Sequence, residues 1–217
     1  MLTYDNVSKY WNKIFKENSN IKKTNTTNNN DLDKALGWLC TNTDTILDFG
    51  CGNGNLLFIC SLIGSKNHIG IDISKEAINV ANEYKNQFPN GNFRFYNGGI
   101  HSLKSIEPNS IDAFIFSNIL DNLLPLDSLK VIKETKRIIK SKGKILIKLN
   151  SYLTKYQINK YKIKVIKDNL LDDGLYLWNQ TNEEWIVIFN RYFQVKEYHD
   201  IFFPKHNQFN RLFLLTN

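Results

Sequence analysis

The sequence predicts an α/β protein built on a mostly parallel β-sheet. Between residues 45 and 150, short apolar runs alternate with longer stretches in which apolar residues recur every three or four positions. This alternation is typical of parallel strands joined by crossover helices. The chain has 217 residues, 42% of them apolar, which is enough for one domain with a complete core. We therefore expect a single domain with a doubly wound sheet.

The first 44 residues are expected to form a helical cap that precedes this core. Residues 5–16 carry apolar side chains at helical spacing, which indicates an amphipathic helix. Residues 17–30 are polar and are expected to form a loop that orders when substrate binds. A second short helix is expected around Leu32, Leu36 and Leu39.

The core itself is expected at residues 45–150. Five strands are expected, at residues 45–49, 68–72, 92–96, 111–116 and 144–149. Three helices alternate with them, at residues 55–63, at residues 75–87, and from about residue 126 to a point before Gly143. Ser74 is suited to cap the second of these helices, because a serine hydroxyl accepts a hydrogen bond from the first turn. The fourth strand is apolar throughout, as expected of a strand buried on both faces.

Residues 151–217 differ from the core in their pattern of residue types. Residues 151–190 are rich in Tyr and Trp with few strand signals, and we expect them to form an aromatic lid over the substrate. Residues 192–197 and 211–215 predict an antiparallel hairpin at the end of the sheet. The single domain 1–217 thus divides into a cap (1–44), a core (45–150), a lid insert (151–190) and a hairpin (191–217).

Composition and charge exclude several classes of protein. No apolar run approaches the roughly 18 residues of a membrane-spanning helix, and no secretory signal starts the chain, so a cytoplasmic protein is predicted. Three cysteines and no clustered His, Asp and Glu argue against a disulfide framework and a metal site. The net charge is +7, but 24 of the 28 basic residues are lysine. Since nucleic-acid readers favour arginine, a nucleic-acid partner is not favoured.

A glycine-rich turn is the strongest functional signal. Residues 48–54 read Asp-Phe-Gly-Cys-Gly-Asn-Gly and lie between the first strand and the first core helix. Glycines permit positive φ and let a ligand approach bare backbone. Asp72 ends the second strand, where a carboxylate can accept hydrogen bonds from ribose hydroxyls. The alternatives are a ligand-free tight turn and a dinucleotide site, although the third glycine of a dinucleotide motif would stand at Asn55.

This turn and four later segments resemble the motifs of the class I S-adenosylmethionine-dependent methyltransferases. The five segments occur in the family's order, at residues 46–54, 70–78, 95–99, 110–120 and 137–147. The resemblance implies a Rossmann-like doubly wound sheet with S-adenosylmethionine as cofactor and S-adenosylhomocysteine as product. It covers about half of the chain.

The resemblance also implies a set of cofactor contacts. These are Asp48, Gly50, Cys51, Gly52, Asn53, Gly54, Asp72, Ile73, Gly99, Ile100 and Ser117. Asp48 would anchor the loop and meet the cofactor's amino group through water, Asp72 would hold the ribose hydroxyls and Ile73 would pack on the adenine. The chain departs from the family at Gly99, where an acid often binds the adenine amino group, and at Asp121-Asn122, where many relatives have a histidine.

Methyl transfer by in-line displacement needs a positioned nucleophile, and a base only when the nucleophile carries a proton. His101 is the first candidate for that base, ahead of His199 and His206, with Tyr10 as a donor or lid residue. The candidate substrate-binding residues are Tyr10, Trp11, Asn118, Tyr152 and Trp178. The alternative for the aromatic residues, Trp185 included, is a place in the core of a helical cap.

The first functional hypothesis is methyl transfer to a small molecule. The alternatives are a nucleic-acid or protein methyltransferase and a non-catalytic S-adenosylmethionine-binding protein. A dinucleotide oxidoreductase is disfavoured by the glycine spacing.

Overall fold

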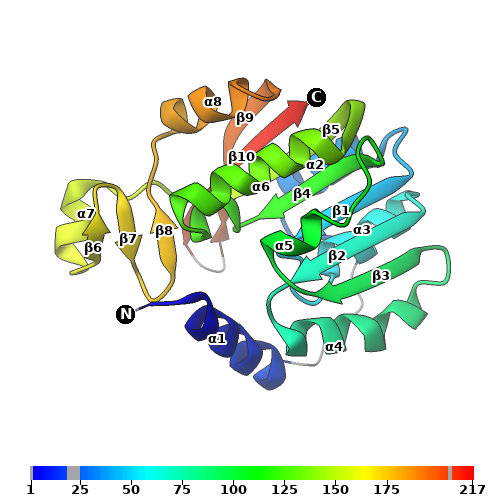
Figure 1. Cartoon of the computed structure of the whole chain (residues 1–217), viewed down its shortest axis with the longest axis horizontal. Coiled ribbons are helices and arrows are strands. Elements are labelled where there is room, and N and C mark those ends of the chain that lie inside the picture. The colour runs from blue at the N-terminus through cyan, green and yellow to red at the C-terminus, as the bar shows by residue number, and fades with distance from the viewer. Residues whose placement is uncertain (1, 19–24, 205–206) are drawn as a thin grey trace.

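The computed structural model describes residues 2–18, 25–204 and 207–217, and its main feature is a seven-stranded sheet (Figure 1). The strand order is β3-β2-β1-β4-β5-β10-β9. These strands are β1 (Thr45–Phe49), β2 (Asn67–Asp72), β3 (Asn92–Asn97), β4 (Ile111–Ser117), β5 (Ile139–Asn150), β9 (Gln194–Phe203) and β10 (Gln208–Thr216). The first five are parallel, and β10 and β9 are antiparallel. The predicted mostly parallel sheet with a C-terminal hairpin is confirmed.

Helices cover both faces of this sheet, so the doubly wound arrangement is also confirmed. The helices are α1 (Tyr4–Glu17), α2 (Asn30–Cys40), α3 (Asn55–Ile63), α4 (Lys75–Tyr84), α5 (Ile100–Leu103), α6 (Pro125–Ile138), α7 (Lys155–Lys160) and α8 (Asn182–Asn190). Two single 3-10 turns, η1 (Lys85–Gln87) and η2 (Leu120–Asn122), follow α4 and β4. Apolar side chains of α2, α3 and α4 pack on one face of the sheet, and those of α5, α6 and α8 on the other.

The central strand β4 is buried on both faces of the sheet. Phe114 and Phe116 point into one apolar cluster, and Ala113 and Ile115 into the other. All four are at most 1% exposed. The expected cap of the second core helix is present as well, because the Ser74 hydroxyl accepts a hydrogen bond from the Ala77 N–H.

Several elements differ from the sequence prediction, the small sheet and β5 most clearly. Residues 151–190 contain a second, three-stranded antiparallel sheet of β6 (Lys164–Lys167), β7 (Leu170–Asp172) and β8 (Tyr176–Trp178). Strand signals are few in this part of the sequence, because strands of three or four residues are too short to show an alternating pattern. Strand β5 begins at Ile139 rather than residue 144, and a register shift opposite Ile111 and Ala113 accommodates the extra residues.

Helix α1 lies beside the carboxyl ends of the parallel strands. In Figure 1 the arrowheads of β2, β3 and β4 point toward α1 and the small sheet. The Ser8 hydroxyl donates to the Ile73 carbonyl at 3.1 Å, and Asn12 Oδ1 accepts from the Ser74 hydroxyl at 2.9 Å. At the start of α1, the Tyr4 hydroxyl donates to Asp127 of α6 at 2.9 Å. The cap is therefore fastened to both sides of the strand ends. No helix in the described part of the chain is long and apolar enough to cross a membrane.

Candidate functional site

The carboxyl ends of β1, β2 and β4 open into a cavity of about 840 Å³, which α1 covers. Most of the expected cofactor contacts line it. Those that do are Asp48, Gly50, Cys51, Gly52, Asn53, Asp72, Ile73, Gly99, Ile100 and Ser117. Of the other expected residues, His101, Trp11 and Asn118 also line the cavity.

The glycine turn forms the floor of the cavity with a backbone that only glycine adopts readily. Gly50, Gly52 and Gly54 have φ values of 79°, 53° and 81°. The N–H groups of Gly50 and Cys51 both donate to the Ile71 carbonyl, at 2.8 and 3.1 Å, and so tie the turn to the end of β2. Gly54 does not line the cavity. A Cβ atom there would stand 2.8 Å from the Phe95 ring, so this glycine allows the helix to pack against β3.

Asp72 joins the glycine turn to the turn after β2. Its Oδ2 accepts the Gly52 N–H and its Oδ1 the Ser74 N–H, each at 2.8 Å. Burial raises the pKa of this carboxyl, and the two N–H groups lower it. Each carboxylate oxygen can accept a second hydrogen bond. Asp72 therefore fixes the floor and can still bind a diol.

Asp48 is the second buried acid of the floor. It is 1% exposed, and its Oδ1 has no hydrogen-bond partner among the residues that the structure describes. Burial, and next the charge of Asp72, raise its pKa well above the usual value, while Lys148 opposes the shift. Burial lowers the pKa of Lys148 itself to about 8. Because Asp48 lines the cavity, its buried charge favours a cationic group of a ligand there.

Asn118 follows β4 and lines the cavity. Its side chain is held by a series of hydrogen-bonded polar side chains that the sequence analysis missed. Its φ is 55°, and its Nδ2 donates to Asn150 Oδ1 at 2.6 Å. Asn150 Nδ2 donates in turn to Asp121 Oδ2 at 3.1 Å and to Asn122 Oδ1 at 2.9 Å. Because Asn150 Nδ2 is engaged there, its oxygen must face Asn118, which leaves Asn118 Oδ1 as an acceptor.

Asp121 is the anchor of this chain of amides. It is fully buried, and it also accepts the Asn150 backbone N–H at 2.7 Å. Burial raises its pKa, whereas the Asn150 hydrogen bonds and the charge of Arg211 lower it. The only signal in the sequence was Asp121-Asn122, noted as a departure from the family pattern. The contacts to Asn150 span 28 and 29 residues and could not be inferred from spacing.

The inner face of α1 supplies the apolar roof. Trp11 and Phe15 line the cavity, with their ring centroids 5.9 Å apart. A Cβ atom on Gly52 would stand 2.9 Å from Phe15, so this ring lies directly over the glycine turn. Phe15 was missed as a site residue, although the amphipathic pattern of residues 5–16 had indicated its face. Tyr10 does not line the cavity; it is 47% exposed and packs edge-on against Trp11.

Three other expected residues do not line the cavity, and a fourth falls outside the described residues. Trp178 is buried against Trp185, with ring centroids 4.9 Å apart, as the core alternative had it. Tyr152 is 39% exposed and does not line the cavity. His199 lies on β9 beside Glu197, 3.3 Å away. His206 falls outside the described residues.

Comparison with known proteins places this geometry in a family. Residues 41–200 match the family model described as a methyltransferase domain. The tRNA N(3)-methylcytidine methyltransferase trm140 of Schizosaccharomyces pombe is 27% identical over 159 residues, which cover 70% of this chain and 52% of that protein. The chain thus spans about half the length of this curated relative.

Solved structures share the fold at lower identity. A SAM dependent methyltransferase from Aquifex aeolicus aligns with a TM-score of 0.65 and 17% identity, covering 94% of this chain and 97% of that one. The N-methyltransferase NodS from Bradyrhizobium japonicum, solved with S-adenosyl-l-homocysteine, aligns with a TM-score of 0.64 and 14% identity over 87% and 86% of the two chains. Both confirm the Rossmann-like architecture that the sequence motifs had implied. With the domain model matching most of the sequence, the chain belongs to the class I S-adenosylmethionine-dependent methyltransferase family.

Proposed function

We propose that the protein binds S-adenosylmethionine in the cavity and transfers its methyl group to an acceptor, with S-adenosylhomocysteine as the product. The observation that carries this proposal is the pair of buried acids, Asp48 and Asp72, beneath the glycine turn. The cofactor supplies an activated sulfonium methyl group. The protein's task is to bind and orient the two reactants and to exclude water.

The residues of the cavity fit this cofactor. Asp72 can accept both ribose hydroxyls with its remaining lone pairs, and the negative charge of Asp48, which lines the cavity, favours the ammonium group there. Ile73 and Ile100 offer apolar surface for the purine ring. The cavity of about 840 Å³ lies in the size range of small-molecule sites and leaves space for a second reactant.

The acceptor proposed here is a small molecule with an N–H or O–H group at the methylated atom. The aromatic roof of Trp11 and Phe15 encloses the cavity, which suits a small ligand better than a polymer. Asn118 Oδ1 can accept a hydrogen bond from a protonated nucleophile, since only the Nδ2 atom of this side chain is engaged among the residues that the structure describes. His101 is the candidate base in the wall of the cavity.

The segment 151–190 contributes to the enclosure, which supports its assignment as a lid insert. Leu175 lines the cavity, and Asn122 Nδ2 donates to the Tyr176 carbonyl at 2.8 Å. The Tyr176 hydroxyl donates to the Leu2 carbonyl at 2.6 Å, so the insert also contacts the start of the cap. We assign 1–44 as the cap, 45–150 as the cofactor-binding core and 191–217 as the closing hairpin.

A second candidate acceptor is an RNA. The curated relative is named as a tRNA methyltransferase, and Lys104, Lys130 and Lys133 lie at the edge of the cavity. Binding of tRNA by such lysines would weaken steeply with salt.

The experiment that separates these acceptors uses S-adenosylmethionine with a tritiated methyl group. The protein is incubated with a low-mass cell extract, with total tRNA and with protein in parallel, and S-adenosylhomocysteine formation is followed by chromatography. We expect label in the low-mass fraction. Label in tRNA would establish the RNA alternative, and cofactor binding without transfer to any fraction would indicate a non-catalytic binding protein.

Gly99→Asp is expected to tighten S-adenosylhomocysteine binding about fivefold. Gly99 has φ −136°, which any residue can adopt, and a Cβ atom there meets no atom within 4 Å. The new carboxylate can accept a hydrogen bond from the adenine amino group, and about 1 kcal/mol is reasonable for such a bond at a half-buried position. Calorimetry measures the change. Gly99→Ala is the matched control, and equal affinities of the two variants would contradict the prediction.

A further inference from the structure

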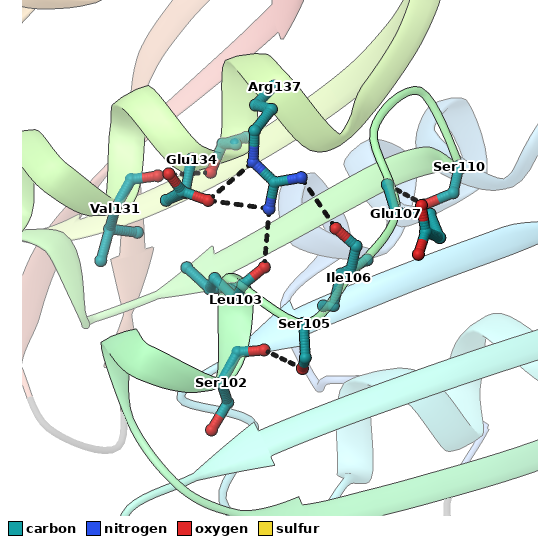
Figure 2. Close-up of polar contacts among 10 residues, drawn as sticks. Ser102, Leu103, Ser105, Ile106, Glu107, Ser110, Val131, Glu134 and Arg137 are labelled. Atoms are coloured by element: carbon teal, nitrogen blue, oxygen red, sulfur yellow. Dashed lines mark hydrogen bonds and ion pairs between the residues drawn. The ribbon is translucent and has the colours of Figure 1, made fainter.

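Arg137 of α6 is joined to the short helix α5 by its guanidinium (Figure 2). Nη1 donates to the Ile106 carbonyl at 2.8 Å and Nη2 to the Leu103 carbonyl at 2.9 Å. Nε donates to Glu134 Oε2 at 2.8 Å, and Nη2 lies at the same distance from that oxygen. Both carbonyls belong to the chain at and just after the end of α5, so one planar group fixes two points of this segment.

The segment that Arg137 fixes forms one wall of the cavity. Helix α5 begins directly after Gly99, and Ile100, His101 and Lys104 line the cavity. This wall follows β3, whereas the glycine turn follows β1. Arg137 itself does not line the cavity, and it acts on a ligand only through the residues it holds, which are the segment at α5 and Glu134, itself a residue of the cavity wall.

Helix α5 has little means of holding its own position. It is four residues long, and isolated helices of this length are unstable. Within the segment, backbone hydrogen bonds run from Ser102 to Gly99 at 2.9 Å, from Lys104 to His101 at 3.1 Å and from Ile106 to Leu103 at 3.2 Å. Its apolar contacts are the fully buried Leu103 side chain and the partly buried Ile100 and Ile106, which pack against the same core cluster. The position of the wall therefore depends on contacts with the rest of the protein.

Glu134 orients the guanidinium for this task. It lies one turn before Arg137 on α6, and its side chain is 24% exposed against 33% for Arg137. With Nε and one edge of Nη2 directed at Glu134, the remaining N–H groups are aimed at α5 (Figure 2). A lysine at this position has one nitrogen and cannot reproduce the three separated contacts.

We propose that Arg137 is a positioning residue that sets the specificity of the cavity for a purine, by holding residues 99–101 against the base of the bound adenosyl group. The proposal rests on the proposed function for the identity of the ligand. It assigns Arg137 no contact with the cofactor and no part in the chemical step.

The test uses the full chain with Arg137→Met and Arg137→Lys, and Arg191→Met as the matched control, because Arg191 is an exposed arginine at the end of α8. The first readout needs no ligand. Amide hydrogen exchange of Ser102, Lys104 and Ile106 is expected to become at least about tenfold faster in Arg137→Met, with the lysine variant in between and the control unchanged.

The second readout is calorimetric binding of S-adenosylhomocysteine and of S-cytidylhomocysteine, in which a pyrimidine base replaces the purine. Arg137→Met is expected to lose about tenfold in affinity for the first ligand and most of the wild-type discrimination between the two. A general loss of stability would weaken both ligands alike and leave their ratio unchanged.

Each outcome bears on a separate statement. Unchanged exchange at α5 in Arg137→Met overturns the role of Arg137 in holding the wall. Changed exchange with an unchanged ratio of affinities overturns its role in purine specificity. Changed exchange in a protein whose wild type binds neither ligand overturns the proposed function, and the purine assignment with it. If Arg137→Met fails to fold, Arg137→Lys carries the same comparisons.

Discussion

Asp72→Ala is expected to weaken S-adenosylhomocysteine binding by about a hundredfold or more. The substitution removes the acceptors of two ribose hydroxyls and releases the Gly52 N–H, which fixes the glycine turn. Hydrogen bonds to charged groups contribute about 1.5–3 kcal/mol each, and two of them account for a loss of this size. Isothermal titration calorimetry with the wild type and the variant measures it.

Two controls separate lost ligand contacts from a displaced turn. Asp72→Asn keeps the shape and one acceptor oxygen, and its affinity should fall between the other two. Ser74→Ala removes the hydroxyl that caps α4 and donates to Asn12 of α1 but leaves both Asp72 hydrogen bonds in place, so its loss of affinity should be much smaller than that of Asp72→Ala. An Asp72→Ala affinity within threefold of the wild type would show that Asp72 serves only the fold.

Asp48→Asn is expected to have opposite effects on stability and on binding. Asp48 is buried with an unpartnered oxygen, and burial together with the Asp72 charge raises its pKa well above the usual value. Ionised Asp48 therefore destabilises the ligand-free protein, and the neutral amide relieves this. We expect Tm to rise by about 3 °C near pH 7, or about 1 kcal/mol for a chain of this size. Binding of S-adenosylhomocysteine should fall about tenfold, because its ammonium group loses an ionic partner.

The pH dependence of the Tm difference between this variant and the wild type tests whether ionised Asp48 destabilises the folded protein. The folded state holds the Asp48 proton more tightly than the unfolded state, so the free energy of unfolding of the wild type falls as the pH rises from the unfolded pKa of about 3.9 to the raised folded pKa. Asp48→Asn lacks this contribution. The Tm difference between variant and wild type should therefore be small near pH 4 and grow toward neutral pH. A difference that shrinks with rising pH would contradict the account.

The local patterns of the sequence predicted the core of the fold well. The first strand and first core helix have the expected bounds, because each is a short apolar segment delimited by polar residues or glycine. The Asp72 position followed from the end of the second strand. The glycine turn was also located correctly, since its spacing and its place between strand and helix are properties of nine consecutive residues.

The features that were missed depend on contacts between distant residues. Asn150 meets Asp121 across the ends of β5 and η2, and Phe15 reaches the glycine turn only because α1 folds back over the sheet. Trp178 carried a substrate role in the sequence analysis because of its residue type. Its burial against Trp185 is set by packing within residues 151–190, which periodicity does not reveal.

The central claim is that the cavity beneath α1 is an S-adenosylmethionine site, and calorimetric titration of the full chain with S-adenosylhomocysteine tests it most directly. The account predicts binding of one ligand per chain, lost in Asp72→Ala, and no binding of NAD under the same conditions. Binding of NAD in place of S-adenosylhomocysteine, or binding that Asp72→Ala leaves intact, would contradict it.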